Sequence, residues 1–263
     1  MFDFFNNYSY IIQSFIATIF TWFITALGAA AVFFFKKINK TILDAMLGFS
    51  AGIMIAASFW SLLSPALEMA NTLSINLIVI ILGFLSGGLL LFVGDKVFSI
   101  IAKRKTIDNK FKRCFLLMSS ITLHNIPEGM VIGVAFGSLA YGIEGATLAS
   151  AIALAIGIGL QNFPEGSAIS LPLRREGYSR FKSFFYGQLS GLVEPISAII
   201  GALLVLKIRL ILPFLLSFAA GAMIYVVVEE LIPESQTNTN KELMTFFTLI
   251  GFSIMTFLDI TLS

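Results

Sequence analysis

The sequence predicts an all-α integral membrane protein that folds as a bundle of eight transmembrane helices. The first observation is composition: 57% of the 263 residues are hydrophobic and only 12% are charged, and the mean hydropathy is +0.93. Soluble domains carry about 25% charged residues. The second observation is that eight stretches are long and apolar enough to cross a bilayer. No ten-residue alternation of apolar and polar residues favours a closed barrel instead.

A helix needs roughly 20 apolar residues to span ~30 Å of hydrocarbon. The first such stretch is too long for the apolar core of a secretion signal, and the residues before it lack basic side chains, so we interpret it as the first span. The connections are short, which predicts one transmembrane transporter domain over residues 1–263. The expected spans are approximately 9–35, 43–69, 74–101, 114–140, 146–172, 183–206, 210–232 and 242–261.

The basic residues predict the orientation of these spans. All 17 lysines and arginines except Lys207 and Arg209 fall on the side of the loops that follow odd-numbered spans. Basic loops remain in the cytoplasm, so we expect both termini on the extracellular or periplasmic side. The residues behind this expectation are Lys36, Lys37, Lys40, Lys96, Lys103, Arg104, Lys105, Lys110, Lys112, Arg113, Arg174, Arg175, Arg180, Lys182 and Lys241.

Spans two and seven contain a repeat. "FSAGIMI" (49–55) and "FAAGAMI" (218–224) share five of seven residues, and each is followed by a proline and a glutamate. Spans four and five share a second repeat, N-x-P-E-G. Because the related spans run in opposite directions, we expect a 3+2+3 inverted-repeat bundle. Inverted repeats with interrupted helices are typical of transporters.

Polar residues lie in the middle of three predicted spans. His124 and Glu128 are four residues apart on span four, so they share a helix face. Gln161 and Glu165 have the same spacing on span five, and Glu194 lies in "GLVEP" on span six. Prolines and glycines beside them favour helix irregularities and close helix packing.

A charged side chain at mid-membrane costs roughly 2.5–3.5 kcal/mol. Three carboxylates would together cost about 8–10 kcal/mol, comparable with the stability of an ordinary domain, about 5–15 kcal/mol. The sequence has no mid-span lysine or arginine between 114 and 200 to offset that cost, which leaves protons or bound cations. Single polar residues in spans more often join helices by hydrogen bonds, but the same composite on two helices favours a metal site.

Imidazole with carboxylates suits zinc and its first-row neighbours, whereas calcium and magnesium prefer all-oxygen ligands. Asn125 comes one residue after His124, and Asn162 one residue after Gln161. Each asparagine is therefore rotated about 100° around its helix from the residue before it. They would face a second position with Glu194, with Glu128 and Glu165 bridging the two metals.

"HNIPEG" (124–129) and "QNFPEG" (161–166), together with "GFSAGIM" and "LVEP", resemble the ZIP (Zrt/Irt-like) family of divalent metal transporters, and within it the bacterial GufA-like branch. The resemblance covers essentially the whole chain. It implies zinc uptake into the cytoplasm across the bacterial inner membrane, with iron, manganese or cadmium as alternatives. It also implies a homodimer and an elevator-like motion of spans 1, 4, 5 and 6 against spans 2, 3, 7 and 8.

The resemblance further implies a binuclear centre. His124, Glu128, Gln161 and Glu165 would form one position, with Met54 completing it, although a methionine in an apolar helix also serves packing. Asn125, Asn162 and Glu194 would form the second. Family members often carry a His-Glu pair at the end of span seven; this chain has Glu229 and Glu230, which are candidate cytoplasmic exit ligands or interfacial acids that snorkel to water. The histidine-rich loop of many members is absent, because His124 is the one histidine of the sequence.

Several function classes are disfavoured. The net charge of +2 and the lack of a basic helix argue against nucleic-acid binding, and one cysteine cannot form an internal disulfide or a thiolate cluster. No nucleotide-binding glycine-lysine loop is present, and no cofactor is expected. We therefore expect a secondary transporter and no enzyme. A passive metal channel built from the same residues is one alternative; a metal-dependent intramembrane hydrolase, which lacks the H-E-x-x-H pattern, is another.

Overall fold

The computed structural model of the protein describes residues 7–34, 39–104, 109–141, 147–207 and 209–262. Every regular element in these residues is a helix, which confirms the predicted all-α class. Six helical segments are long and apolar enough to cross a membrane: 10–34, 40–72, 77–97, 180–206, 212–235 and 241–261. The chain is thus a multi-pass membrane protein. The two motif-bearing helices are also long but are not among these six, and they contain the polar residues described above.

The first half of the chain contains α2 (Tyr10–Phe34), α3 (Lys40–Ala57), η1 (Ser58–Leu63), α4 (Ser64–Thr72), α5 (Leu77–Arg104), α6 (Asn109–Ser138) and η2 (Leu139–Tyr141). The second half contains α7 (Leu148–Arg175), α8 (Arg180–Leu189), η3 (Ser190–Leu192), α9 (Val193–Lys207), η4 (Arg209–Ile211), α10 (Leu212–Val226), η5 (Val227–Leu231), α11 (Ile232–Ser235) and α12 (Lys241–Leu262).

The two helices that share the apolar repeat are interrupted in the same way. The π-helix η1 separates α3 from α4, and the π-helix η5 separates α10 from α11. Each interruption ends two residues before a proline, Pro65 in one case and Pro233 in the other. Proline has no N–H to donate and clashes with the preceding turn, and π turns, which are rare, occur mostly as single interruptions within α-helices.

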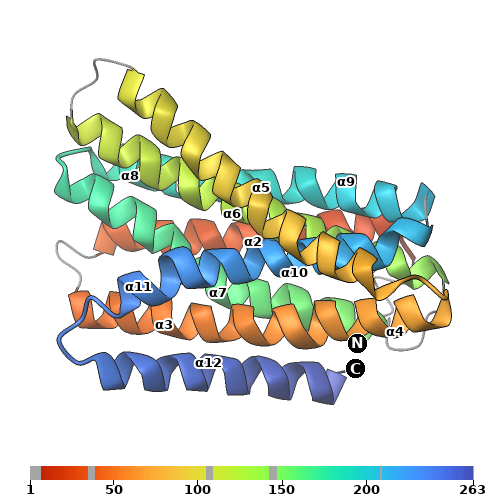
Figure 1. Ribbon diagram of the computed structural model, residues 1–263. Coiled ribbons are helices and arrows are strands. Elements are labelled where there is room, and N and C mark those ends of the chain that lie inside the picture. The colour runs from red at the N-terminus through yellow and green to blue at the C-terminus, as the bar shows by residue number, and fades with distance from the viewer. Residues whose placement is uncertain (1–6, 35–38, 105–108, 142–146, 208, 263) are drawn as a thin grey trace.

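Most of the helices run roughly along one direction, with α5 crossing obliquely (Figure 1), and their contacts divide them into two sets. In the first bundle, α2 packs along α7 and α6 packs along α9, which continues from α8. In the second bundle, α3 packs along α12 and α5 packs along α10. The two sets meet where α3 contacts α7 and where α10 contacts α6. An apolar cluster containing residues from both sets, including Met54, Ile132 and Leu154, fills the space between them.

The bundle has two distinct ends. One end is where α3 begins. The α11–α12 connection is attached to α3 there by two hydrogen bonds: Ser235 Oγ donates to the Asp44 carbonyl and Asn238 Nδ2 donates to Asp44 Oδ2, both at 2.8 Å. We call this the α3-start end; it lies on the left in Figure 1. At the opposite end α12 finishes near α4, so we call it the α4 end.

Candidate metal site

The two N-x-P-E-G motifs lie in the interior of continuous α-helices. Pro127 is inside α6 and Pro164 is inside α7. The motif glycines explain why neighbouring helices come so close: a Cβ on Gly129 would overlap the backbone oxygen of Glu194, and one on Gly166 would overlap the backbone oxygen of Thr25. These contacts bring α9 against α6 and α2 against α7 at the level of the motifs.

Glu194 reaches the same level from a third helix. It stands in the first turn of α9, directly after the 3₁₀ turn η3. Within that turn, a Cβ on Gly191 would lie 3.0 Å from the Thr25 hydroxyl and 3.2 Å from Glu194 Oε1. A larger residue at 191 would therefore press on the carboxyl group, and the glycine leaves it room to face α7.

A hydrogen bond joins the two motifs. Gln161 donates through Nε2 to Oε1 of Glu128, and both side chains are fully buried. The other oxygen of each group, Glu128 Oε2 and Gln161 Oε1, has no hydrogen-bond partner. The amide nitrogen of Gln161 thus faces the carboxylate of Glu128, and one buried oxygen of each group is left without a donor.

A second set of bonds surrounds Glu194. Asn162 donates through Nδ2 to Glu194 Oε1 at 2.9 Å, and the Thr21 hydroxyl donates to Glu194 Oε2. Both oxygens of Glu194 thus have a donor, whereas Glu128 has a donor to Oε1 and none to Oε2. Asn162 Oδ1 has none. All three residues are fully buried.

The cluster as a whole has an excess of unsatisfied acceptors. Six of its buried side-chain atoms have no partner: Asn125 Nδ2 and Oδ1, Glu128 Oε2, Gln161 Oε1, Asn162 Oδ1 and Glu165 Oε2. A buried polar atom left unpaired costs about 1–3 kcal/mol. The three glutamates are close enough to interact electrostatically, and no lysine or arginine in the described part of the chain forms an ion pair with them. Five of the six atoms are oxygens that can accept hydrogen bonds or bind a cation.

No described contact joins three of the predicted ligands to the other side chains of this cluster. Asn125 is buried, but neither of its side-chain polar atoms has a hydrogen-bond partner. The side chain of His124 lies outside the described residues. Met54 is fully buried and belongs to the apolar cluster between the bundles. Among the residues that the structure does describe, no three His, Cys, Asp or Glu side chains form a metal cage. The buried atoms without a partner also include the amide oxygens of Gln161 and Asn162.

A cavity of about 470 Å³ opens beside Glu165 at the α3-start end. Four glutamates contribute to its wall, Glu165, Glu229, Glu230 and Glu234. We call this cavity the acidic vestibule. Its other lining residues are Leu43, Leu47, Ile121, Ala168, Pro172, Leu231, Pro233 and Thr237. Glu165 thus connects the buried cluster with the vestibule, and the predicted exit pair Glu229 and Glu230 lies along that route.

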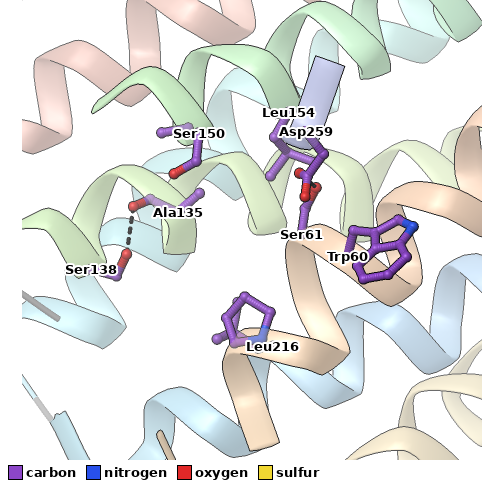
Figure 2. A pocket seen from close by; sticks show the side chains of 10 residues that line it. Trp60, Ser61, Ala135, Ser138, Ser150, Leu154, Leu216 and Asp259 are labelled. Carbon is purple, nitrogen blue, oxygen red and sulfur yellow. Dashed lines mark hydrogen bonds between the residues drawn. The ribbon is translucent and has the colours of Figure 1, made fainter. Parts of the chain in front are cut away.

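The α4 end has a much smaller pocket, about 70 Å³, that contains none of the predicted site residues. Figure 2 shows Ser61 and Asp259 pointing toward one another there, and Ser61 Oγ donates to Asp259 Oδ1 at 2.6 Å. The pocket is lined by residues of η1, α4, α6, α7, α10 and α12. Of these two pockets, the acidic vestibule at the α3-start end is the larger.

Sequence reasoning missed Thr21 and Glu234. Glu234 follows Glu230 by four residues, a spacing that would have placed both on one helix face. Thr21 belongs to a row of polar residues in an apolar span, but nothing in its local sequence links it to Glu194, 173 residues away.

Comparison with known proteins gives a consistent result. Residues 106–259 match the family model described as ZIP Zinc transporter. The chain is 35% identical to "Zinc transporter ZIP11" of Xenopus tropicalis over 98% of this chain and 99% of that protein. It is 38% identical to "Zinc transporter ZIPB" of Bordetella bronchiseptica over 90% of this chain and 77% of the relative. It is 30% identical to "Zinc transporter GufA" of Myxococcus xanthus over 90% and 94%, respectively.

Proposed function

The chain belongs to the ZIP family of zinc transporters, and from that premise we propose that it moves zinc into the cytoplasm through a binuclear site formed by α6, α7 and α9. Family membership makes the chain a metal-ion transporter and not an enzyme, so the hydrolase alternative is dropped. The metal is the transported substrate; no cofactor is involved.

The observation that carries the proposal is the group of six unpartnered buried atoms around three carboxylates. The hydrogen bonds divide the group into two halves, Gln161 with Glu128 and Asn162 with Glu194. This division supports one position that contains Glu128 and Gln161, to which we assign His124, Glu165 and Met54 as further ligands on the family resemblance. It supports a second position that contains Asn162 and Glu194, to which we assign Asn125, with Glu128 and Glu165 shared.

We place the acidic vestibule on the cytoplasmic side. The described basic residues Lys40, Arg174 and Lys241 lie near its end of the bundle, as the positive-inside rule requires; Lys36, Lys37 and Lys105 lie outside the described residues. Both termini would then be extracellular or periplasmic, in the inner membrane of a bacterial cell. In this orientation the acidic vestibule faces inward, with Glu229, Glu230 and Glu234 receiving the ion from Glu165.

Alternating access would follow from a displacement of the first bundle against the second. Their contact surface is mainly apolar, which favours sliding because few directional bonds must break. The pairing of α2 with α7 and α6 with α9, and of α3 with α12 and α10 with α5, is what an inverted repeat of eight spans would produce. The π interruptions in α3–α4 and α10–α11 support the same symmetry.

Zinc flux into proteoliposomes tests the proposal. Zinc uptake by the purified protein should saturate and should exceed uptake of calcium or magnesium, with manganese, iron and cadmium compared in parallel. Flux that rises without saturation would favour a channel. Absence of any zinc flux, with the protein folded and correctly inserted, would refute the function.

We also propose a homodimer in the bilayer. Many apolar side chains of α5 and α12 are exposed, Leu85 and Phe257 among them, and lipid or a second copy must cover them. Chemical cross-linking in native membranes should yield a dimer; a monomer at every protein density would contradict it.

A further inference from the structure

A row of polar side chains runs along the buried face of α2, a helix that carries none of the motifs. Its members follow one another at three or four positions, the spacing that keeps residues on one side of a helix. They are Ser14, Thr18, Thr21 and Thr25, and all are fully buried. This face packs on α7 and α9, the helices that carry Asn162 and Glu194.

Thr21 differs from its neighbours in the row. Ser14, Thr18 and Thr25 donate to carbonyls of their own helix. The Thr21 hydroxyl lies 3.1 Å from the Thr18 carbonyl but closer to Glu194 Oε2. A hydroxyl has one proton to donate, and a carboxylate is the stronger acceptor. The proton of Thr21 is therefore directed across the helix interface to Glu194.

Thr21 also contacts the other half of the pair. Its backbone oxygen accepts a hydrogen bond from Asn162 Nδ2 at 3.4 Å, while the same nitrogen donates to Glu194 Oε1. With its nitrogen held on this side, Asn162 keeps Oδ1 free of any partner. One residue of α2 thus orients both the carboxylate and the amide.

From these contacts we propose that Thr21 is a positioning residue for the Glu194 half of the binuclear site. The inference rests on the proposed function. When a cation binds Glu194 through Oε1, the Asn162 amide has to release that oxygen and turn Oδ1 toward the ion. The Thr21 bond to Oε2 stays in place, because a carboxylate oxygen bound by a hydroxyl leaves the other oxygen available. Thr21 therefore holds the carboxylate in a metal-ready orientation in the empty and the loaded state.

Partners that orient metal ligands in this way typically contribute 10–100-fold in affinity. Thr21→Val keeps the shape of the side chain but removes the donor, so zinc should bind the Glu194 position about 10–100-fold more weakly. Thr21→Ser restores the hydroxyl and should restore affinity to near that of the unchanged protein.

The matched control is Thr18→Val. Thr18 is equally buried one turn earlier, and its hydroxyl bonds only to the carbonyls of Ser14 and Phe15 in the described contacts. Zinc affinity of the purified protein would be measured by competition with a chelating dye, and thermal unfolding in chelator would report stability. Weaker binding with Thr21→Val but not with Thr18→Val, at comparable stability, is the expected result. Equal affinities of Thr21→Val and Thr18→Val, or no rescue by serine, would overturn the inference.

A double-mutant cycle separates this inference from the proposed function. In a Glu194→Gln background, Thr21→Val should have no further effect on zinc affinity, because the metal-binding carboxylate that Thr21 orients is already absent. If Glu128→Gln binds zinc as tightly as the unchanged protein, the proposed metal site itself is wrong. If Glu128→Gln loses binding while Thr21→Val behaves as Thr18→Val does, the site stands and only the role of Thr21 falls.

Discussion

Gln161 donates its amide hydrogen bond to Glu128, 33 residues earlier in the chain, and so ties the motif of α7 to that of α6. The bond holds the amide nitrogen toward the carboxylate and leaves Gln161 Oε1 and Glu128 Oε2 without partners. The two motifs are therefore held together by a contact between two side chains that we propose as ligands of one metal position.

Neutralising Glu128 or Glu165 should abolish zinc uptake. Glu128→Gln and Glu165→Gln keep the side-chain size but remove the charge that a dication requires. Each of these glutamates has an oxygen without a partner, so we expect the metal-free variants to gain about 1–3 kcal/mol in stability. Uptake in proteoliposomes and thermal unfolding in chelator measure the two effects.

The control for that experiment is Glu194→Gln. Both oxygens of Glu194 are hydrogen-bonded, so its neutralisation breaks existing bonds and should not stabilise the metal-free protein. Zinc uptake retained by both Glu128→Gln and Glu165→Gln would contradict the site.

Replacing Gln161 by histidine should change metal selectivity. Imidazole suits zinc better than manganese, which prefers oxygen ligands. We expect Gln161→His to strengthen zinc binding several-fold more than manganese binding. Equilibrium competition between the two metals measures the ratio. A ratio identical to that of the unchanged protein would place Gln161 away from the metal.

The acidic vestibule should accelerate release of the ion. Glu229→Gln, Glu230→Gln and Glu234→Gln each remove one negative charge from its wall, so we expect slower zinc flux with little change in equilibrium affinity at the buried cluster. Since exposed charges are screened with a Debye length of about 8 Å at physiological salt, the effect should shrink as salt increases.

Glu242→Gln is the matched control for the vestibule. Glu242 is exposed in the first turn of α12 but does not line the cavity. The Glu242→Gln substitution removes one negative charge, as the vestibule variants do, at the same end of the bundle. Equal slowing by Glu242→Gln and the vestibule variants would show a general surface-charge effect.

A hydrogen bond between the two bundles should influence the rate of transport. Ser50 Oγ on α3 donates to the backbone oxygen of Gln161 on α7 at 3.4 Å. A neutral hydrogen bond contributes about 0.5–1.5 kcal/mol, so Ser50→Ala should alter the zinc uptake rate by at most about tenfold. Ser217→Ala is the control, because Ser217 is buried in α10 and donates to Phe214 of its own helix. No difference between the two variants would remove Ser50 from the transport cycle.

The helical class and the membrane location could be predicted from the sequence because both depend on local composition. A run of apolar residues such as that of α5 has to satisfy its backbone hydrogen bonds internally in lipid, whatever it packs against. The π turns η1 and η5 were not predicted. A proline in the sequence predicts an irregularity in the helix. Whether the helix kinks, ends or widens there depends on how the neighbouring helices pack against it.

The site was predictable to the same extent. Helix periodicity places His124 with Glu128 on one face of α6 and Gln161 with Glu165 on one face of α7. That Glu128 and Gln161 share one position was implied by the family resemblance, and the hydrogen bond between them is a tertiary contact. The metal ligation itself, including the roles of His124 and Met54, remains a proposal.

By itself, the sequence determined that this chain is a helical membrane protein with acidic groups in its interior, because span length and helix spacing are properties of neighbouring residues. Only the tertiary structure decided which of those acids are already satisfied. Glu194 accepts a hydrogen bond from Thr21, which is 173 residues away in the sequence. Glu128 and Glu165 each have one oxygen without a hydrogen-bond partner. Such pairings depend on how closely glycine-lined helices approach one another, and that distance is set by packing of the whole bundle.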